Sequence, residues 1–164
     1  MEQPEGLRTK RRYPAREVPR TGAAPCVDLR RTTDDGGSRV ETTTEAKTIL
    51  ICEDEDSLRE LVRVSLGDAY NYVEAADGVE SIELARELRP DLVILDLMLP
   101  RKSGVEVLAE LRGDRAIRDT PVVVITAWTH AQQAAVAAGA DRFVAKPFDP
   151  DELREVVLDV LRGT

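Results

Sequence analysis

The stretch Asp91-Leu92-Val93-Ile94-Leu95-Asp96-Leu97-Met98-Leu99-Pro100 decides how this chain folds. Residues 92–95 form a continuous apolar run, rich in side chains that favour strands. A strand that is apolar on both faces belongs inside a parallel sheet that helices cover on both sides. The stretch therefore predicts an α/β protein with this strand in the middle of the sheet.

Asp96 stands where this central strand ends. Open α/β sheets bind their ligands at the carboxyl ends of the strands, so Asp96 is a candidate functional residue. A solvated strand end, or a cap for the following helix, would explain the same aspartate. The stretch alone does not decide among these alternatives.

Apolar segments elsewhere in the chain alternate with helical patterns. The predicted strands are 48–52, 72–75, 92–95, 121–125 and 142–145. The predicted helices begin near Asp56 or Ser57, at Val79, at Gly104, at Trp128 and at Pro150. Strand 72–75 is the least apolar and is expected at an edge. The alternation predicts a five-stranded, doubly wound parallel sheet with right-handed crossovers.

Several local features of the helices can be predicted as well. Ser57 and Glu60 have the spacing of a capping box for the first helix. Asp77-Gly78 is typical of a turn before the second helix, whose inner face should include Leu88. The inner face of the first helix is expected to carry Leu58, Leu61, Val62 and Leu66.

Composition places the chain among globular proteins and gives it an acidic domain. It has 164 residues and a net charge of −8. Residues 48–164 carry thirteen Lys/Arg and twenty-three Asp/Glu, a net charge of −10, whereas residues 1–47 carry +2. An acidic domain is a poor direct binder of nucleic acid and suits a cation site. With no membrane-spanning run and no apolar signal segment, a cytoplasmic protein is expected.

The domain boundary is predicted near residue 46. Residues 1–46 contain four prolines and few apolar side chains, so they are expected to be a disordered extension. An alternative start at Val40 would leave most of this extension unmade. Residues 47–164 are expected to form the folded domain. Its Cys52 lies in an apolar strand and is expected to be a core residue.

Polar residues follow four of the predicted strands at one edge of the sheet: Glu53 and Asp54, Asp96, Thr126, and Lys146. Converging carboxylates call for a divalent cation, and their hard oxygen ligands suit Mg²⁺ or Mn²⁺. With the cation bound, Asp96 could act as a nucleophile towards phosphorus. The Lys146 ammonium would neutralise phosphoryl oxygens, and Thr126 would donate a hydrogen bond to one of them.

The ordered set of these motifs resembles the receiver domain of bacterial two-component response regulators, the CheY-like family. The motifs are Ile51 to Glu55, Asp77-Gly78, Asp91 to Pro100 with Gly104, Thr126-Ala127, and Gly139 to Asp141 before Lys146-Pro147-Phe148. The resemblance spans about residues 47–164. Each motif is weak by itself, and the complete set in order is strong.

The resemblance implies the strand order 2-1-3-4-5 and a role for each site residue. Asp96 would accept a phosphoryl group from a histidine kinase or a histidine phosphotransfer protein. Asp54, Asp96 and the backbone carbonyl of Met98 would bind Mg²⁺, with Glu53 acting through water. The resemblance also implies a cis peptide between Lys146 and Pro147, and a switch pair formed by Thr126 and Phe143. Glu53 and Phe143 depart from the family's commoner Asp and Tyr.

The expected function is that of a stand-alone receiver, a phosphorylation switch rather than a conventional enzyme. Its output would be a protein–protein contact through the face formed by the fourth helix, fifth strand and fifth helix, and a homodimer could form on phosphorylation. One alternative is an interaction module with the same fold that does not depend on phosphate. The other is a hydrolase or nucleotide-binding enzyme. The first strand is not followed by the Gly-rich loop that would bind a nucleotide phosphate, which argues against this alternative.

Overall fold

The computed structural model describes residues 46–127 and 132–163, in which strands and helices alternate along the chain. The strands are β1 (Thr48–Cys52), β2 (Asn71–Ala75), β3 (Leu92–Asp96), β4 (Val122–Thr126) and β5 (Arg142–Ala145). The helices are α1 (Asp56–Leu66), α2 (Gly78–Leu88), α3 (Gly104–Gly113), α4 (Gln132–Ala137) and α5 (Pro150–Arg162). The predictions for residues 1–45, and for the start of the fourth helix at Trp128, lie outside the described residues.

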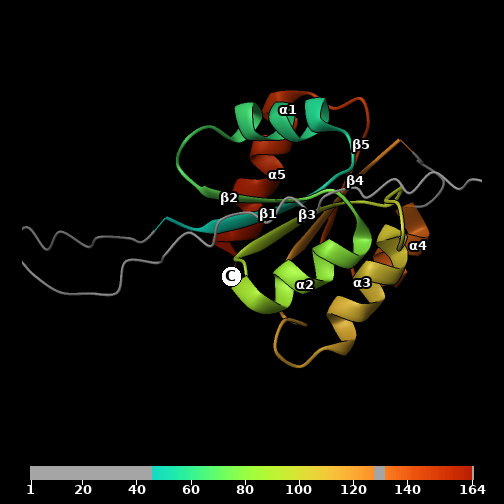
Figure 1. The fold of residues 1–164 in the computed structure, drawn as a ribbon. Coiled ribbons are helices and arrows are strands. Elements are labelled where there is room, and N and C mark those ends of the chain that lie inside the picture. Colours follow the sequence, from blue (N-terminus) through green and yellow to red (C-terminus); the bar gives the residue numbers. More distant parts are fainter. Residues whose placement is uncertain (1–45, 128–131, 164) are drawn as a thin grey trace, which may run out of the picture. The chain divides into compact units, whose positions relative to one another are not determined.

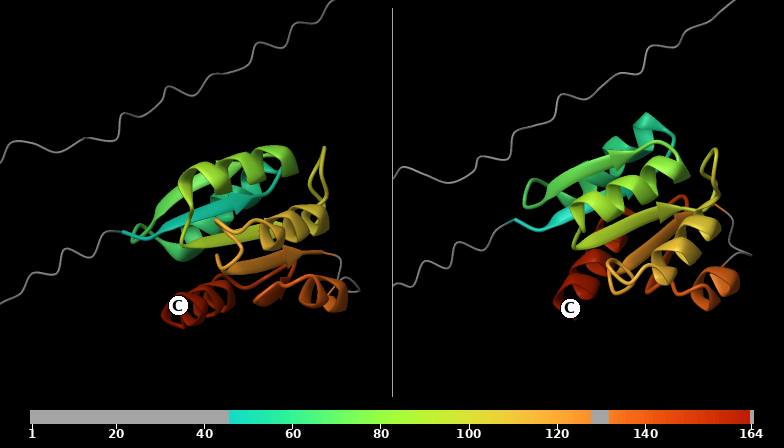
Figure 2. Two further views of the ribbon diagram at one scale, coloured as in Figure 1. Left: turned by 90° about the horizontal axis from the view of Figure 1, so that it is seen from below. Right: turned by 60° about the horizontal axis from the view of Figure 1, so that its bottom comes forward.

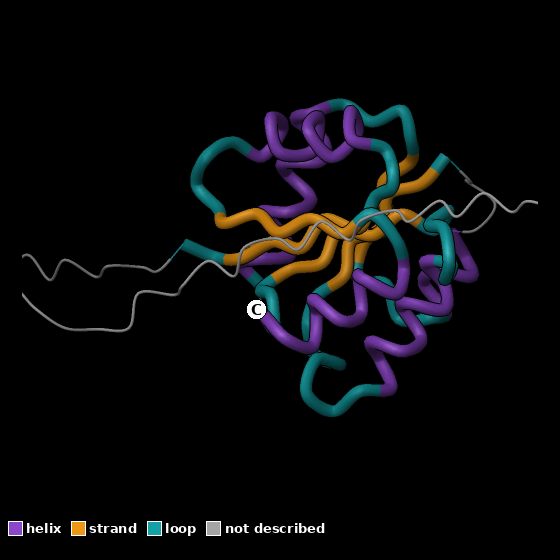
Figure 3. Tube along the Cα trace, in the orientation of Figure 1, coloured by secondary structure: helices purple, strands orange, loops and turns teal. Residues whose placement is uncertain are grey.

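All neighbouring strands of the sheet are parallel, in the order β2-β1-β3-β4-β5. This confirms the predicted fold class, with β3 in the centre and β2 at an edge. Leu92 of β3 pairs with Ile49 of β1, and Val93 pairs with Val122 of β4. Figure 3 shows the strands as one twisted layer between the helices.

Helices cover both faces of this sheet, which is why its central strands are apolar throughout. α1 and α5 lie on one face, and α2 and α3 lie on the other (Figures 1 and 2). Since side chains alternate along a strand, Leu50, Val93 and Val124 join the core under α2 and α3. Ile94 and Ile125, one residue further along, join the core under α1 and α5.

Two leucines expected inside are exposed. Leu61 of α1 is 38% exposed, because the buried stripe of that helix runs through Val62, Ser65 and Leu66 beside it. Leu88 is 44% exposed. It is the last residue of α2, where the inward-facing row has already ended at Ala85. Helical spacing alone does not tell where a neighbouring layer stops.

The start of α1 also differs from the prediction. The N-cap residue is Glu55, without a side-chain hydrogen bond to the helix, so the capping box of Ser57 and Glu60 does not form. Ser57 lies inside the first turn, and its hydroxyl donates to the Glu55 carboxylate instead. Asp77, expected in a turn, is the N-cap of α2 and accepts from the amides of Val79 and Glu80.

Cys52 is a buried core residue, as the sequence predicted. Burial raises the pKa of its thiol to about 12, although a hydrogen bond with Ser81 opposes the shift. Because the thiolate is the reactive form, we expect Cys52 to resist a maleimide reagent at neutral pH in the folded protein. The other cysteine of the chain, Cys26, is replaced by serine so that only Cys52 can react. Intact mass of this variant should show no adduct until denaturant is added. Rapid labelling of the folded variant would contradict the burial of Cys52.

None of the helices in the described part of the chain has the length and apolar character needed to cross a bilayer.

Candidate functional site

The residues that follow the strands lie together at one edge of the sheet. The register brings the ends of β1 and β3 side by side, since Cys52 pairs with Leu95, and the ends of β4 and β5 likewise, since Thr126 pairs with Ala145. Parallel strands have their carboxyl ends at the same edge, so the side chains that follow them meet there. Glu53, Asp96 and Thr126 are buried at 1%, 4% and 0% exposure.

Lys146 joins two of the acids directly. Its ammonium donates to Glu53 Oε2 and to Asp96 Oδ2, each at 2.5 Å. Its backbone amide donates to the carbonyl of Thr126 at 2.9 Å, which holds the residue beside the end of β4. The Lys146–Pro147 peptide is cis, as the family resemblance implied. Lys146 therefore lies between the acids of β1 and β3 as their counter-ion.

The pKa shifts agree with this arrangement. Burial raises the pKa of Glu53, and the hydrogen bond and charge of Lys146 offset only part of the rise. Burial on its own would lower the pKa of Lys146, but the hydrogen bonds and charges of Asp96 and Glu53 outweigh it and raise that pKa. Lys146 therefore remains a cation at neutral pH, available to neutralise negative oxygens.

The acids fit a hard divalent cation. Carboxylate oxygens of Glu53, Asp54 and Asp96 all lie within 4.8 Å of one another. Asp54 is exposed and forms no ion pair with any residue that the structure describes, whereas Glu53 and Asp96 are buried. Oxygen ligands at this separation, with one of them open to water, match the preferences of Mg²⁺. The longer side chain of Glu53 spans the distance to Lys146 without leaving this cluster.

Asp96 is neither a solvated strand end nor a helix cap. Its side chain is buried, and its Oδ1 accepts from the amide of Met98 at 3.1 Å. The N-cap of α3 is Ser103, which forms a complete capping box with Glu106. The loop after Asp96 is apolar because Leu97 and Leu99 are buried in the core, while the Met98 side chain is 62% exposed.

Thr126 and Phe143, the expected switch pair, lie on the neighbouring strands β4 and β5. Val124 pairs with Phe143 and Thr126 with Ala145, so Thr126 lies two residues closer than Phe143 to the edge that holds the acids. The Phe143 ring is partly buried against the core under α2 and α3. By strand alternation, Thr126 and Val124 share that face. The two residues therefore occupy one face of the sheet.

Two residues of the site were missed by sequence reasoning or only partly understood. Gly104 was identified as a helix start, but a Cβ atom there would lie 2.1 Å from the Asp96 carbonyl oxygen. No sequence motif points to Arg59. Its guanidinium contacts the Glu53 backbone and the side chains of Asp56 and Glu74. The only sequence signal was its spacing three residues after Asp56, which suggests an ion pair on a helix.

Comparison with known proteins agrees with this geometry. Residues 49–158 match the family model of the response regulator receiver domain. The DNA-binding dual master transcriptional regulator RpaA of Synechocystis is 40% identical over 119 residues, covering 71% of this chain and 49% of RpaA. The chain thus spans about half the length of the curated relatives it matches.

Two solved structures share the fold over nearly their whole length. The chemotaxis response regulator CheY4 of Vibrio cholerae is 31% identical with a TM-score of 0.66, covering 70% of this chain and 98% of CheY4. The receiver domain of the sensor histidine kinase PA1611 of Pseudomonas aeruginosa is 27% identical with a TM-score of 0.64, covering 73% of this chain and 99% of that domain. It holds a magnesium ion in its active-site cleft.

Proposed function

Because the chain belongs to the response regulator receiver family, we propose that its Asp96 accepts a phosphoryl group from a sensor histidine kinase or a histidine phosphotransfer protein. Receivers are phosphoacceptor switches rather than classical enzymes. The observation that carries the proposal is the buried Asp96 carboxylate, held by the Met98 amide and by Lys146 beside Glu53 and Asp54. This carboxylate ends the central strand and faces the other polar strand ends.

In the proposed reaction, a carboxylate oxygen of Asp96 attacks the phosphorus atom of phosphohistidine. The new O–P bond forms as the N–P bond breaks, and the histidine nitrogen keeps the electron pair. Lys146 stabilises the negative phosphoryl oxygens, since its ammonium already contacts Asp96. Asp54, Asp96 and the Met98 carbonyl would hold Mg²⁺, with Glu53 acting through water, and the bound cation supplies further neutralisation of charge.

The switch is proposed to run from Asp96 through Thr126 to Phe143. Thr126 would donate to the new phosphoryl group, and the Phe143 ring would turn inward, which changes the surface of α4, β5 and α5. Two features support this path: the buried position of Thr126 beside β5 and the partial burial of Phe143 on the same face. A downstream protein, or a second copy of the chain, would bind the altered surface.

The proposal concerns residues 47–164 as the receiver domain. Stand-alone action and a cytoplasmic location stay predictions, and the expectation of no nucleic-acid partner conflicts with RpaA, a DNA-binding regulator. Since residues 48–164 carry a net charge of −10, we propose only that these residues do not themselves contact DNA.

The test is phosphorylation by a small phosphodonor such as acetyl phosphate, followed by intact mass. We expect a mass increase of one phosphoryl group per chain in the presence of MgCl₂ and none in its absence. A chain that stays unlabelled with MgCl₂ would contradict the proposal and would favour the interaction module that does not depend on phosphate. An omitted-donor control accounts for any adduct formed during handling.

A further inference from the structure

Arg59 of α1 lies beside the acidic loop that follows β1, although it is not one of the acids. Its side chain is only 12% exposed. Its Nη1 donates to the backbone carbonyl of Glu53 at 2.6 Å, and its Nε donates to Glu74 at 3.2 Å. Its Nη2 donates to Asp56. One guanidinium thus joins the β1–α1 loop, the first turn of α1 and strand β2.

The contact with the Glu53 carbonyl constrains the peptide unit between Glu53 and Asp54. The amide of Glu53 is already held by the Ala75 carbonyl of β2 at 3.0 Å. With the carbonyl held by Arg59, the backbone is fixed on both sides of Glu53. Rotation of the next peptide would redirect Glu53, which is buried, and Asp54, which is exposed. The backbone from which both side chains extend is therefore held by Arg59, while Lys146 also holds the Glu53 carboxylate.

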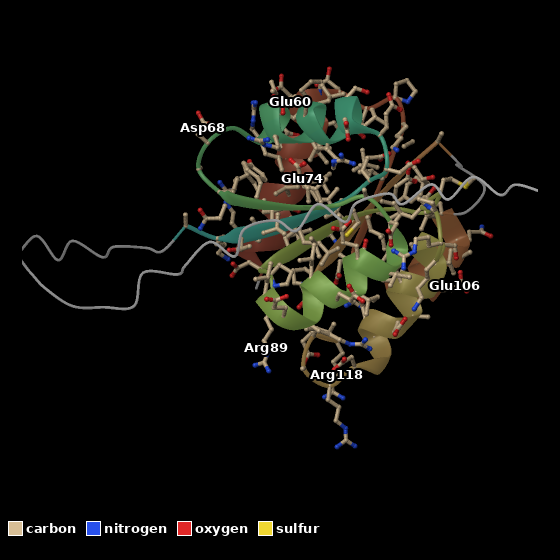
Figure 4. The ribbon with its side chains drawn as sticks, viewed as in Figure 1. Glu60, Asp68, Glu74, Arg89, Glu106 and Arg118 are labelled. Carbon is tan, nitrogen blue, oxygen red and sulfur yellow. The ribbon has the colours of Figure 1, made fainter. Side chains whose placement is uncertain are left out.

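The partners of Arg59 also determine where its charge acts. Glu74, labelled in Figure 4, lies on β2 at the α1 side of the sheet and accepts from Arg59. Asp56 accepts from it as well. Because the guanidinium is paired with these two carboxylates, part of its charge is offset there, and it forms no ion pair with Asp54 or Asp96 among the described residues. The planar fork suits this task, since it can bind several acceptors in fixed directions.

We propose that Arg59 is a positioning residue that sets the Mg²⁺ affinity of the acidic loop by holding the peptide between Glu53 and Asp54. This inference rests on the proposed function, because it concerns the same cation site. Arg59 has no hydrogen bond to the carboxylates of Glu53, Asp54 or Asp96 in the described part of the chain. It acts through the backbone that carries Glu53 and Asp54, as residues outside a ligand set commonly do.

The proposal predicts the opposite sign from simple electrostatics. Removing a positive charge near a cation site should strengthen Mg²⁺ binding if only charge matters. If positioning matters, Arg59→Met should weaken it, by about tenfold in dissociation constant. Titration calorimetry of the 164-residue chain with MgCl₂ measures this directly. Arg59→Lys keeps the charge but loses the planar guanidinium. Its Mg²⁺ affinity should therefore lie between that of the original chain and that of Arg59→Met.

Arg63→Met is the matched control. Arg63 lies one turn further along α1 and also pairs with Glu74, at 3.4 Å, but it has no contact with the loop. Replacing Arg63 should change the Mg²⁺ dissociation constant by less than about twofold, because its ion pair with Glu74 is exposed to solvent. Far-UV circular dichroism should show that each variant is folded at the temperature of titration. If Arg59→Met does not fold, Arg59→Lys replaces it in the comparison.

A second readout separates positioning from general damage. At saturating MgCl₂, Arg59→Met should be labelled by acetyl phosphate at nearly the rate of the original chain, whereas the MgCl₂ concentration for half-maximal labelling should rise. The inference would be overturned if Arg59→Met bound Mg²⁺ as tightly as the original chain does. Where Arg59→Lys replaces Arg59→Met, the same criterion applies to Arg59→Lys. If the original chain itself neither binds Mg²⁺ nor takes up phosphate, the proposed function fails instead.

Discussion

Replacing Asp96 with asparagine should abolish Mg²⁺-dependent labelling of this chain by acetyl phosphate. The amide is almost the same size as the carboxylate, so the side chain can still accept from the Met98 amide. The amide lacks the anionic oxygen that must attack phosphorus. The substitution also removes one of the three carboxylates that could hold the cation. Intact mass after incubation with donor and MgCl₂ should therefore show only the unmodified variant.

Asp91→Asn is the matched control for this experiment. Asp91 directly precedes the first residue of β3, at the opposite end of the strand from Asp96. It is exposed and accepts a hydrogen bond from the Thr48 amide at 2.7 Å. An asparagine can make the same hydrogen bond, and the residue is remote from the strand ends that hold the acids. This variant should be labelled as the original chain is. Full labelling of the Asp96 variant at another residue would show that Asp96 is not the acceptor.

Gly104→Ala should unfold the loop after Asp96 or strongly destabilise the protein. A Cβ atom at this position would lie 2.1 Å from the Asp96 carbonyl oxygen and 2.6 Å from the Leu97 Cα. These are backbone atoms of a buried strand end, so neither can rotate away. We expect a loss of about 3 kcal/mol in the free energy of unfolding, from strain in a packed interior. The melting temperature should fall by roughly 10 °C.

Gly113→Ala provides the comparison within the same helix. Nothing lies within 4 Å of a Cβ atom built at Gly113, the last residue of α3. Alanine there should leave stability unchanged or raise it by up to about 1 kcal/mol, since it restricts the unfolded chain. Denaturant unfolding of both variants measures the difference. Equal stability of the two would show that the loop after Asp96 can move aside at little cost.

The loop after Asp96 is attached to the helices on either side of it through one short segment. Gly104 donates its amide to the Leu97 carbonyl at 3.0 Å, and the Gly78 amide donates to the Pro100 carbonyl at 3.2 Å. Arg101 donates to Asp77, the cap of α2, at 2.8 Å. The loop that carries Met98 is thus attached to the first residues of both α2 and α3. This attachment keeps the Met98 amide in place for its hydrogen bond to Asp96.

The sequence by itself determined the fold class, and it predicted which polar side chains gather at one edge of the sheet. Apolar runs that alternate with helical patterns allow few arrangements other than a covered parallel sheet. The carboxyl ends of such strands share one edge, so the sequence predicts that Glu53, Asp54, Asp96, Thr126 and Lys146 lie together. The strand order came from the resemblance to receiver domains, and the sheet has that order.

Only the tertiary structure decided which side chains meet across elements and where the layers end. Leu61 and Leu88 have the spacing of buried residues but are exposed, because burial depends on the neighbouring layer as well as on helical period. Arg59 finds its partners on a loop, on its own helix and on β2, which lie together only after folding. The lack of space at Gly104 likewise arises from the backbone of β3, which no local pattern at residue 104 describes.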